Sequence, residues 1–238
     1  MLVRGNCSVK YGPVCFNDGA VQKLKGGDWM MWWHALSVAG SLAVTGPIGV
    51  AIGVWLLAGK SWKLSWMWAL LFGIGMALVV ITKMAFVGWG VGIEAVEFAG
   101  FSGHAMRSAA VYPVAAFLAF RSSRSNARYA ATAIGVVFAV LISISRVPTM
   151  AHSVSESVTG TILGLAIAAA FIRYASSERH WALSRMLVVL CLPILLIAPR
   201  VEPVPAEQWI TQAALYLSGR DQPYTRAMWT ESKHRGHE

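Results

Sequence analysis

Six stretches of the chain are apolar over lengths close to the roughly 20 residues that a helix needs to cross a bilayer. They cover residues 30–58, 64–90, 103–120, 128–145, 155–175 and 183–199. Only 13% of the 238 residues are charged, against about one quarter in an average soluble domain. We therefore predict an all-α fold, a polytopic membrane helical bundle of about six transmembrane helices.

Small residues and a proline predict how these helices bend and pack. Gly46-Pro47 in the first span predicts a kink, which membrane helices tolerate. Gly49-x-x-x-Gly53 and Gly160-x-x-x-Gly164 offer small-residue surfaces on which helices approach closely. These spacings indicate a packed bundle and say nothing about its activity.

The spans divide the chain into a polar N-terminal segment (1–29), a transmembrane bundle (30–199) and a C-terminal tail (200–238). The tail opens with the Pro-rich stretch APRVEPVPAEQ and ends with ESKHRGHE, which is typical of a disordered terminus. Between them, one helical face would collect Trp209, Ile210, Ala213, Ala214 and Leu217. This favours a short helix in the membrane interface, although a helix packed on the bundle has the same pattern.

The distribution of basic residues predicts the orientation. One set of loops carries eight basic residues against the single acid Glu178, a net charge of +7. These are Lys60, Lys63, Arg121, Arg124, Arg128, Arg173, Arg179 and Arg185. An excess of Lys and Arg on short loops marks the cytoplasmic face, so most of the net charge of +9 reflects topology and no nucleic-acid partner is expected.

Both termini are then expected on the periplasmic or exterior side of an inner (plasma) membrane. That compartment permits a disulfide between Cys7 and Cys15, and two free thiols are the alternative. No cysteine spacing typical of a zinc site is present, so no metal site built from cysteine is expected. The outward-facing termini leave room for a protein partner.

Ionisable residues gather at the outward ends of the spans, where they are costly and mark functional sites. Lys83 ends the second span; Ser102, Gly103, His104 and Arg107 open the third; Ser145 and Arg146 end the fourth; His152 and Glu156 open the fifth. Basic side chains and a helix N-terminus favour a phosphate. One histidine suits attack on phosphorus and the other protonation of the leaving oxygen. His152 and Glu156, four residues apart, share a helix face, so the carboxylate can orient the imidazole.

Two stretches resemble signatures of the type-2 phosphatidic acid phosphatase family. Phe101-Ser102-Gly103-His104 is similar to its Pro-Ser-Gly-His signature. Ser145-Arg146, five residues, His152, three residues and Glu156 is similar to its Ser-Arg-x5-His-x3-Asp signature. The resemblance covers about a third of the chain, from Lys83 to Gly164.

The resemblance implies a membrane lipid phosphatase that needs no metal or other cofactor. It implies that His152 is the nucleophile and forms a phosphohistidine, that Glu156 orients it and that His104 is the general acid. Ser102, Gly103 and Arg146 would hold the phosphoryl oxygens. Candidate substrates are phosphatidic acid, phosphatidylglycerol phosphate, undecaprenyl pyrophosphate and lipid A phosphates.

The chain departs from the family pattern in the first signature, Lys-x6-Arg-Pro. Counted from Lys83, that spacing reaches Gly90-Val91, so the arginine is missing. Two readings of Arg107 stay open: it replaces this arginine, or it pairs with Glu94 or Glu97. Lys83 either binds phosphate or snorkels at a helix end.

These departures keep two alternative functions open beside hydrolysis. One is a lipid phosphotransferase, in which a lipid rather than water accepts the phosphoryl group. The other is a non-catalytic relative that binds a lipid phosphate or a protein partner.

Overall fold

The computed structural model describes residues 27–149, 152–178 and 206–229 of the chain. Within them the chain forms a bundle of helices with one isolated antiparallel bridge, between Ile93 and Phe98. The helices are α2 (Gly27–Ala39), α3 (Leu42–Ala58), α4 (Trp62–Trp89), α5 (Gly103–Ala119), α6 (Ser125–Ser145), α7 (Val154–Ser177) and α9 (Ala206–Ser218). The predicted all-α bundle is confirmed. Cys7, Cys15, the expected span at 183–199 and the ESKHRGHE tail lie outside the described residues.

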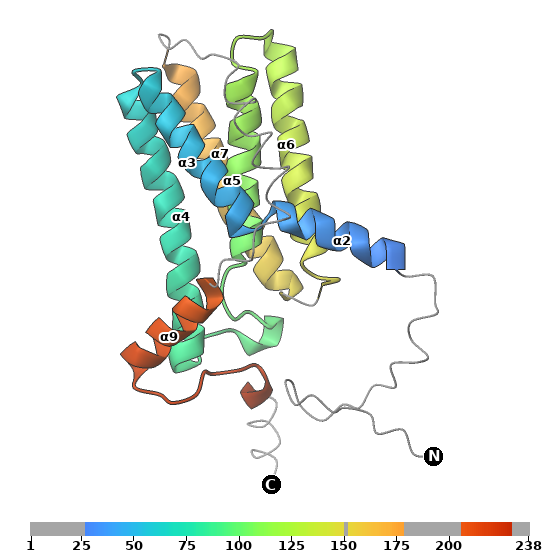
Figure 1. Ribbon diagram of the computed structural model, residues 1–238, viewed down its shortest axis with the longest axis vertical. Coiled ribbons are helices and arrows are strands. Elements are labelled where there is room, and N and C mark those ends of the chain that lie inside the picture. Colours follow the sequence, from blue (N-terminus) through green and yellow to red (C-terminus); the bar gives the residue numbers. More distant parts are fainter. Residues whose placement is uncertain (1–26, 150–151, 179–205, 230–238) are drawn as a thin grey trace, which may run out of the picture.

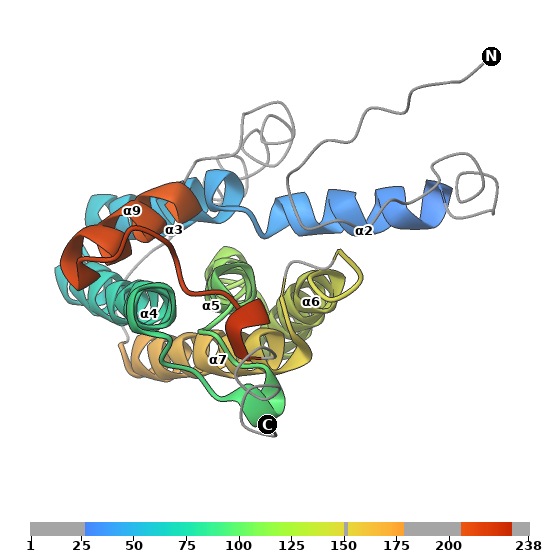
Figure 2. The same cartoon turned by 90° about the horizontal axis from the view of Figure 1, so that it is seen from below.

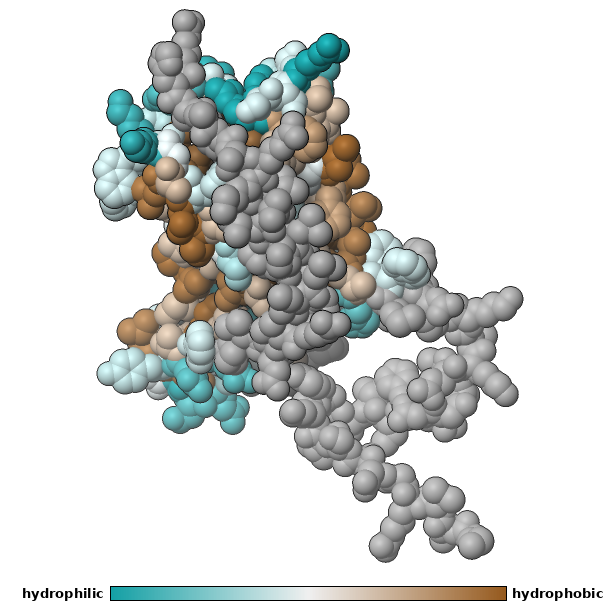
Figure 3. Space-filling view, turned by 45° about the horizontal axis from the view of Figure 1, so that its top comes forward, coloured by the Kyte–Doolittle hydropathy of each residue, from teal (hydrophilic) through white to brown (hydrophobic). Residues whose placement is uncertain are grey.

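Four stretches of the described chain are long and apolar enough to cross a membrane. They are Trp32–Ala58, Trp62–Trp89, Ser125–Ser145 and Val154–Ser177. An apolar belt lies between two more polar ends of the molecule (Figure 3). Length, composition and this belt make the chain a membrane protein.

Helix α5 lies at the centre of the bundle. Figure 2 shows it surrounded by α3, α4, α6 and α7. Its residues from Ala105 to Val114 are all buried. Two glycines of α7 make this possible: a Cβ on Gly160 would lie 2.7 Å from the carbonyl oxygen of Ser102, and one on Gly164 would overlap that of Met106. The predicted packing surface at Gly160-x-x-x-Gly164 is thus used against α5.

The first predicted span, 30–58, is divided in the structure. The chain turns at Gly40-Ser41, and α2 leaves the bundle sideways (Figure 1). α3 continues through Pro47, so the helix breaks before the Gly46-Pro47 position where we predicted a kink. The break has a packing reason, because a Cβ at Gly40 would lie 2.5 Å from the Ile142 side chain on α6. The Tyr112 hydroxyl of α5 also donates a hydrogen bond to the Ala39 carbonyl, at 2.6 Å.

The C-terminal part of the chain returns to the bundle. α9 packs on α4, where Gly88 lets the Ala214 carbonyl approach closely, and Ala214 itself is buried. Trp209, Tyr216 and Leu217 on α9 are exposed. A helix therefore forms at the predicted position, and it contacts the bundle while leaving aromatic side chains free for the membrane interface.

Candidate functional site

The predicted site residues come together at one end of the bundle. The end of α4, the start of α5, the end of α6 and the start of α7 meet there, and α9 lies beside them (Figure 1). The two signature stretches are bonded directly, since the Ser102 N–H donates to the Glu156 carbonyl at 3.2 Å. The basic loops 59–61 and 120–124 lie at the opposite end of the bundle (Figure 1).

His152 and Glu156 form the closest functional pair. His152 Nδ1 lies 2.7 Å from Glu156 Oε2, and the two side chains are 8% and 3% exposed. Because a carboxylate accepts, Nδ1 carries the proton and Nε2 keeps its lone pair. Burial lowers the pKa of His152 below its ordinary value, and the bond to Glu156 opposes that shift. The imidazole is therefore neutral near pH 7 and nucleophilic at Nε2.

The local sequence explains how Glu156 is held. Ser153 is the N-cap of α7, and its hydroxyl accepts from the Glu156 N–H while the Glu156 side chain reaches back to the Ser153 N–H, 3.4 Å away. This capping box satisfies two helix N–H groups. The same carboxylate thus caps the helix and orients the imidazole.

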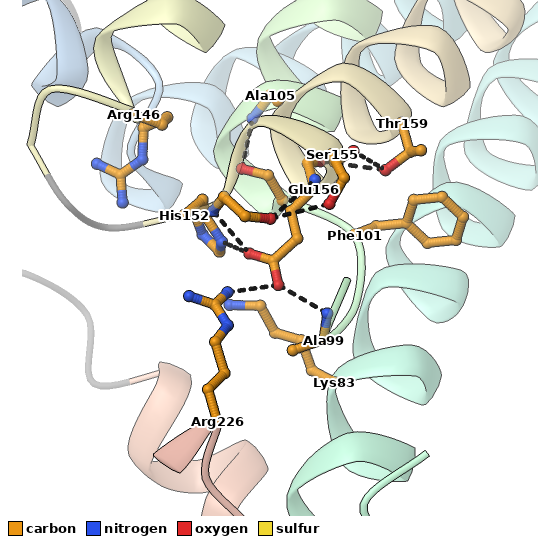
Figure 4. A network of polar contacts seen from close by, with 12 residues as sticks. Lys83, Ala99, Phe101, Ala105, Arg146, His152, Ser155, Glu156, Thr159 and Arg226 are labelled. Carbon is orange, nitrogen blue, oxygen red and sulfur yellow. Dashed lines mark hydrogen bonds and ion pairs between the residues drawn. The ribbon is translucent and has the colours of Figure 1, made fainter. Parts of the chain in front are cut away.

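Both carboxylate oxygens of Glu156 are hydrogen-bonded (Figure 4). Oε1 accepts from the Ala99 N–H at 2.8 Å and from the Arg226 guanidinium at 2.6 Å, while Oε2 binds His152. Arg226 comes from the C-terminal segment, 70 residues further along the chain. It was not among the predicted site residues.

His104, the second residue of α5, lies within electrostatic reach of His152, Arg146 and Arg107. Its ring also approaches Gly40, at the break between α2 and α3, where a Cβ would lie 3.4 Å from it. Ser102 is fully buried and its hydroxyl accepts from the Ala105 N–H as the N-cap of α5. In this structure Ser102 thus caps the helix that carries His104, and its predicted contact with phosphate stays a prediction.

Three arginines surround the histidines, and two of them were predicted. Arg107 is 7% exposed, donates from Nε to Thr45 Oγ1 at 3.1 Å, and folds over Gly103, where a Cβ would lie 2.8 Å from Nη1. Arg107 thus lies within electrostatic reach of His104, and the reading in which it supplies the charge of the missing arginine stays a prediction. Arg146 donates to Ser37 on α2, and its buried Nε has no hydrogen-bond partner. Burial lowers the pKa of Arg146, an arrangement that an anion would relieve.

Lys83 points toward the same site and meets an acid. Its Nζ lies 2.7 Å from Glu207 Oε1 on α9, with side-chain exposures of 18% and 75%. Lys83 holds the pKa of Glu207 below its usual range. The Lys83 charge therefore lies in the wall of the cavity beside the site and is neutralised here by Glu207. Its binding of phosphate stays a prediction.

A cavity of about 570 Å³ opens beside this pair. Its polar lining includes Lys83, His152, Glu156, Glu207, Thr211 and Arg226, with Phe86, Val87 and Ile210 among its apolar walls. His104 and Arg146 do not line it. The cavity therefore leads to His152 from the side of α4 and the C-terminal segment.

Sequence reasoning missed the two C-terminal contributors, Glu207 and Arg226. The only available signal was the amphipathic stretch around Trp209, which indicated a helix near the outer face. That stretch did not indicate which bundle residues the helix would meet.

Comparison with known proteins agrees with the signatures. The PAP2 superfamily matches residues 94–180, a range that contains His104, Arg146, His152 and Glu156. An uncharacterised 22.5 kDa protein in the cps region of Klebsiella pneumoniae is 34% identical over 202 residues, covering 82% of this chain and 96% of that protein. No solved structure gives a significant match. The chain belongs to the PAP2 superfamily, and that membership supports, in general terms, a phosphatase-type activity on a lipid phosphate.

Proposed function

We propose that the protein removes phosphate from a lipid phosphate or pyrophosphate through a phosphohistidine at His152. The observation that carries this proposal is the His152–Glu156 pair, at 2.7 Å, beside a cavity whose lining also holds Lys83. The bond at Nδ1 leaves Nε2 as the nucleophilic atom. Arginine and lysine charges near it suit the oxygens of a phosphoryl group.

The reaction divides into two balanced steps. In the first, His152 Nε2 attacks phosphorus, the bond from phosphorus to the lipid or pyrophosphate oxygen breaks, and His104 donates a proton to that oxygen. In the second, His104 takes a proton from water, the water oxygen bonds to phosphorus, and the bond between phosphorus and Nε2 breaks. Inorganic phosphate leaves and both imidazoles return to their starting states.

Charge supports an outward-facing site. The basic loops 59–61 and 120–124 lie at one end of the bundle, and the starts of α5 and α7, which carry the His104 and His152 stretches, lie at the other (Figure 1). Because basic loops stay in the cytoplasm, the site would act on lipids of the outer leaflet, such as undecaprenyl pyrophosphate. The 1–29 and 200–238 segments would lie on the same side.

The test is phosphate release by the detergent-purified protein from a panel of lipid phosphates and pyrophosphates, with EDTA present throughout. We expect His152→Ala to lose release by about a thousandfold or more, since removal of a nucleophile leaves only binding effects. His34→Ala, which removes an exposed histidine at the edge of the bundle, should retain wild-type release. Phosphate release that survives in the His152→Ala protein would refute the mechanism.

Two other results would point to the alternatives. Phosphate transferred to an added lipid acceptor, with no free phosphate, would indicate a phosphotransferase. Binding of lipid phosphate by a folded preparation without any turnover would indicate a non-catalytic relative.

A further inference from the structure

The C-terminal segment reaches the catalytic pair through one side chain. Arg226 Nη2 lies 2.6 Å from Glu156 Oε1, and Arg226 is 42% exposed while Glu156 is 3% exposed. In the part of the chain that the structure describes, the ion-pair partners of Glu156 are Arg226 and His152. A buried carboxylate is costly unless its charge is compensated, so this contact matters to the pair.

Aromatic contacts on both sides hold Arg226 in place. Tyr224 and Trp229 both pack edge-on against Phe86 of α4, with ring centroids 5.7 and 5.1 Å apart. The Tyr224 N–H donates to the Val87 carbonyl at 2.8 Å. A Cβ on Gly90 would lie 2.8 Å from the Tyr224 ring, and Gly90 itself has a φ of +71°. The segment is therefore a seated part of the site, with Arg226 between its two anchors.

We propose that Arg226 is a positioning residue that acts on the nucleophile, His152, through Glu156. This inference rests on the proposed function. It binds the oxygen of Glu156 that His152 does not bind, and so fixes the plane of the carboxylate. It also shares the negative charge, which leaves the imidazole neutral and its Nε2 free. The residue lies outside the region that the superfamily matches, 94–180.

The charges around His152 set the expected pH dependence. They come from every element packed against it: Lys83, His104, Arg146, Glu156, Glu207 and Arg226. Loss of the Arg226 charge leaves Glu156 with its full charge for His152, which favours the protonated imidazole. The pKa of His152 then rises. As the pH is lowered, the variant therefore loses activity at a higher pH than the wild type does.

The test is Arg226→Gln against Arg220→Gln. Arg220→Gln removes the same charge from the same C-terminal segment. Arg220 is exposed, and its guanidinium lies over the Tyr224 ring. For Arg226→Gln we expect kcat to fall roughly 10- to 100-fold and KM to stay within about twofold. The acid limb of the pH–rate profile, where activity falls as His152 is protonated, should move up by roughly half to one pH unit. Arg226→Lys should recover part of kcat, because it restores the charge. Arg220→Gln should leave all three unchanged.

Three outcomes would overturn the proposal. A rise in KM alone would make Arg226 a substrate ligand. A lower kcat with no change in the acid limb of the pH–rate profile would show that Arg226 only holds the C-terminal segment in place. A profile equal to that of Arg220→Gln would remove any role.

A second measurement works without turnover. Diethyl pyrocarbonate modifies neutral imidazole, so its rate at His152, followed by peptide mass spectrometry across pH, gives the pKa of that residue directly. We expect a higher pKa in Arg226→Gln than in the wild type, and an unchanged value refutes the proposal. If the wild type releases no phosphate, the proposed function fails, while this titration still decides the role of Arg226.

Discussion

Glu156 joins local structure to chemistry within one side chain. Its carboxylate completes the capping box of α7 and at the same time holds His152 Nδ1. The related signature has aspartate at this position, and the longer glutamate suits the capping box, which uses Glu or Gln at the third helical position. The additional methylene therefore does not displace the bond to His152, which is 2.7 Å long.

Glu156→Gln separates these two roles. Glutamine also completes a capping box, so we expect unfolding temperatures close to those of the wild type. It cannot carry the charge that orients and stabilises the imidazole, so kcat should fall by about 10²- to 10⁴-fold.

Steady-state phosphate release and a thermal melt in detergent measure both effects. Glu178→Gln, just after the opposite end of α7, is the matched control and should match the wild type in both. An active Glu156→Gln protein would show that the carboxylate does not serve the nucleophile.

Helix α9 is placed to control access to the ammonium group of Lys83. It packs on α4 (Figure 1). It also sets Glu207 against Lys83 at 2.7 Å, and both residues line the cavity that leads to His152. A carboxylate on a lysine occupies the position that a phosphate oxygen would take. Substrate would then compete with Glu207 for Lys83.

Glu207→Gln should therefore bind phosphate more tightly. Removal of the competing charge is expected to lower KM, and the inhibition constant of inorganic phosphate, by about two- to tenfold, because a partly exposed ion pair contributes little more. Inhibition by phosphate across its concentration range is the measurement.

Asp221→Asn removes an exposed negative charge from the same C-terminal region and should change neither constant. Weaker phosphate binding in Glu207→Gln would show instead that Glu207 holds Lys83 in its binding position.

For the whole molecule, one buried helix sets the distance between the two histidines. α5 begins with the His104 stretch and is enclosed by its neighbours, while α7 begins just after His152. Glycines at the contacts let backbones touch: a Cβ on Gly135 of α6 would lie 2.8 Å from the Tyr112 carbonyl oxygen, and Gly164 of α7 meets Met106 in the same way. Close helix approach therefore keeps His104 and His152 at one site.

Gly164→Ala and Gly73→Ala test this packing with the same chemical change. A Cβ at 164 would overlap the Met106 carbonyl and crowd Ala109, whereas one at 73 meets nothing within 4 Å. We expect Gly164→Ala to destabilise the bundle by about 1–3 kcal/mol and to lower phosphate release as α5 and α7 separate.

Gly73→Ala should be neutral or slightly stabilising, because alanine favours helix. Thermal unfolding in detergent compares the two. Equal melting temperatures would show that the contact between α5 and α7 yields without cost.

Features that depend on local pattern could be predicted from the amino-acid sequence. The apolar runs predicted the helices now described as α4, α5, α6 and α7, and the four-residue spacing predicted that Glu156 meets His152. The predicted shared helix face is wrong, because α7 begins at Val154 and its N-cap Ser153 places His152 before the helix. Tertiary structure alone decided the turn at Gly40-Ser41, the direction of Arg107, and the arrival of Glu207 and Arg226 at the site. Those contacts join residues as far apart as 124 positions. Periodicity constrains which residues share a helix face over a few turns, whereas contacts at such separations depend on how whole helices pack.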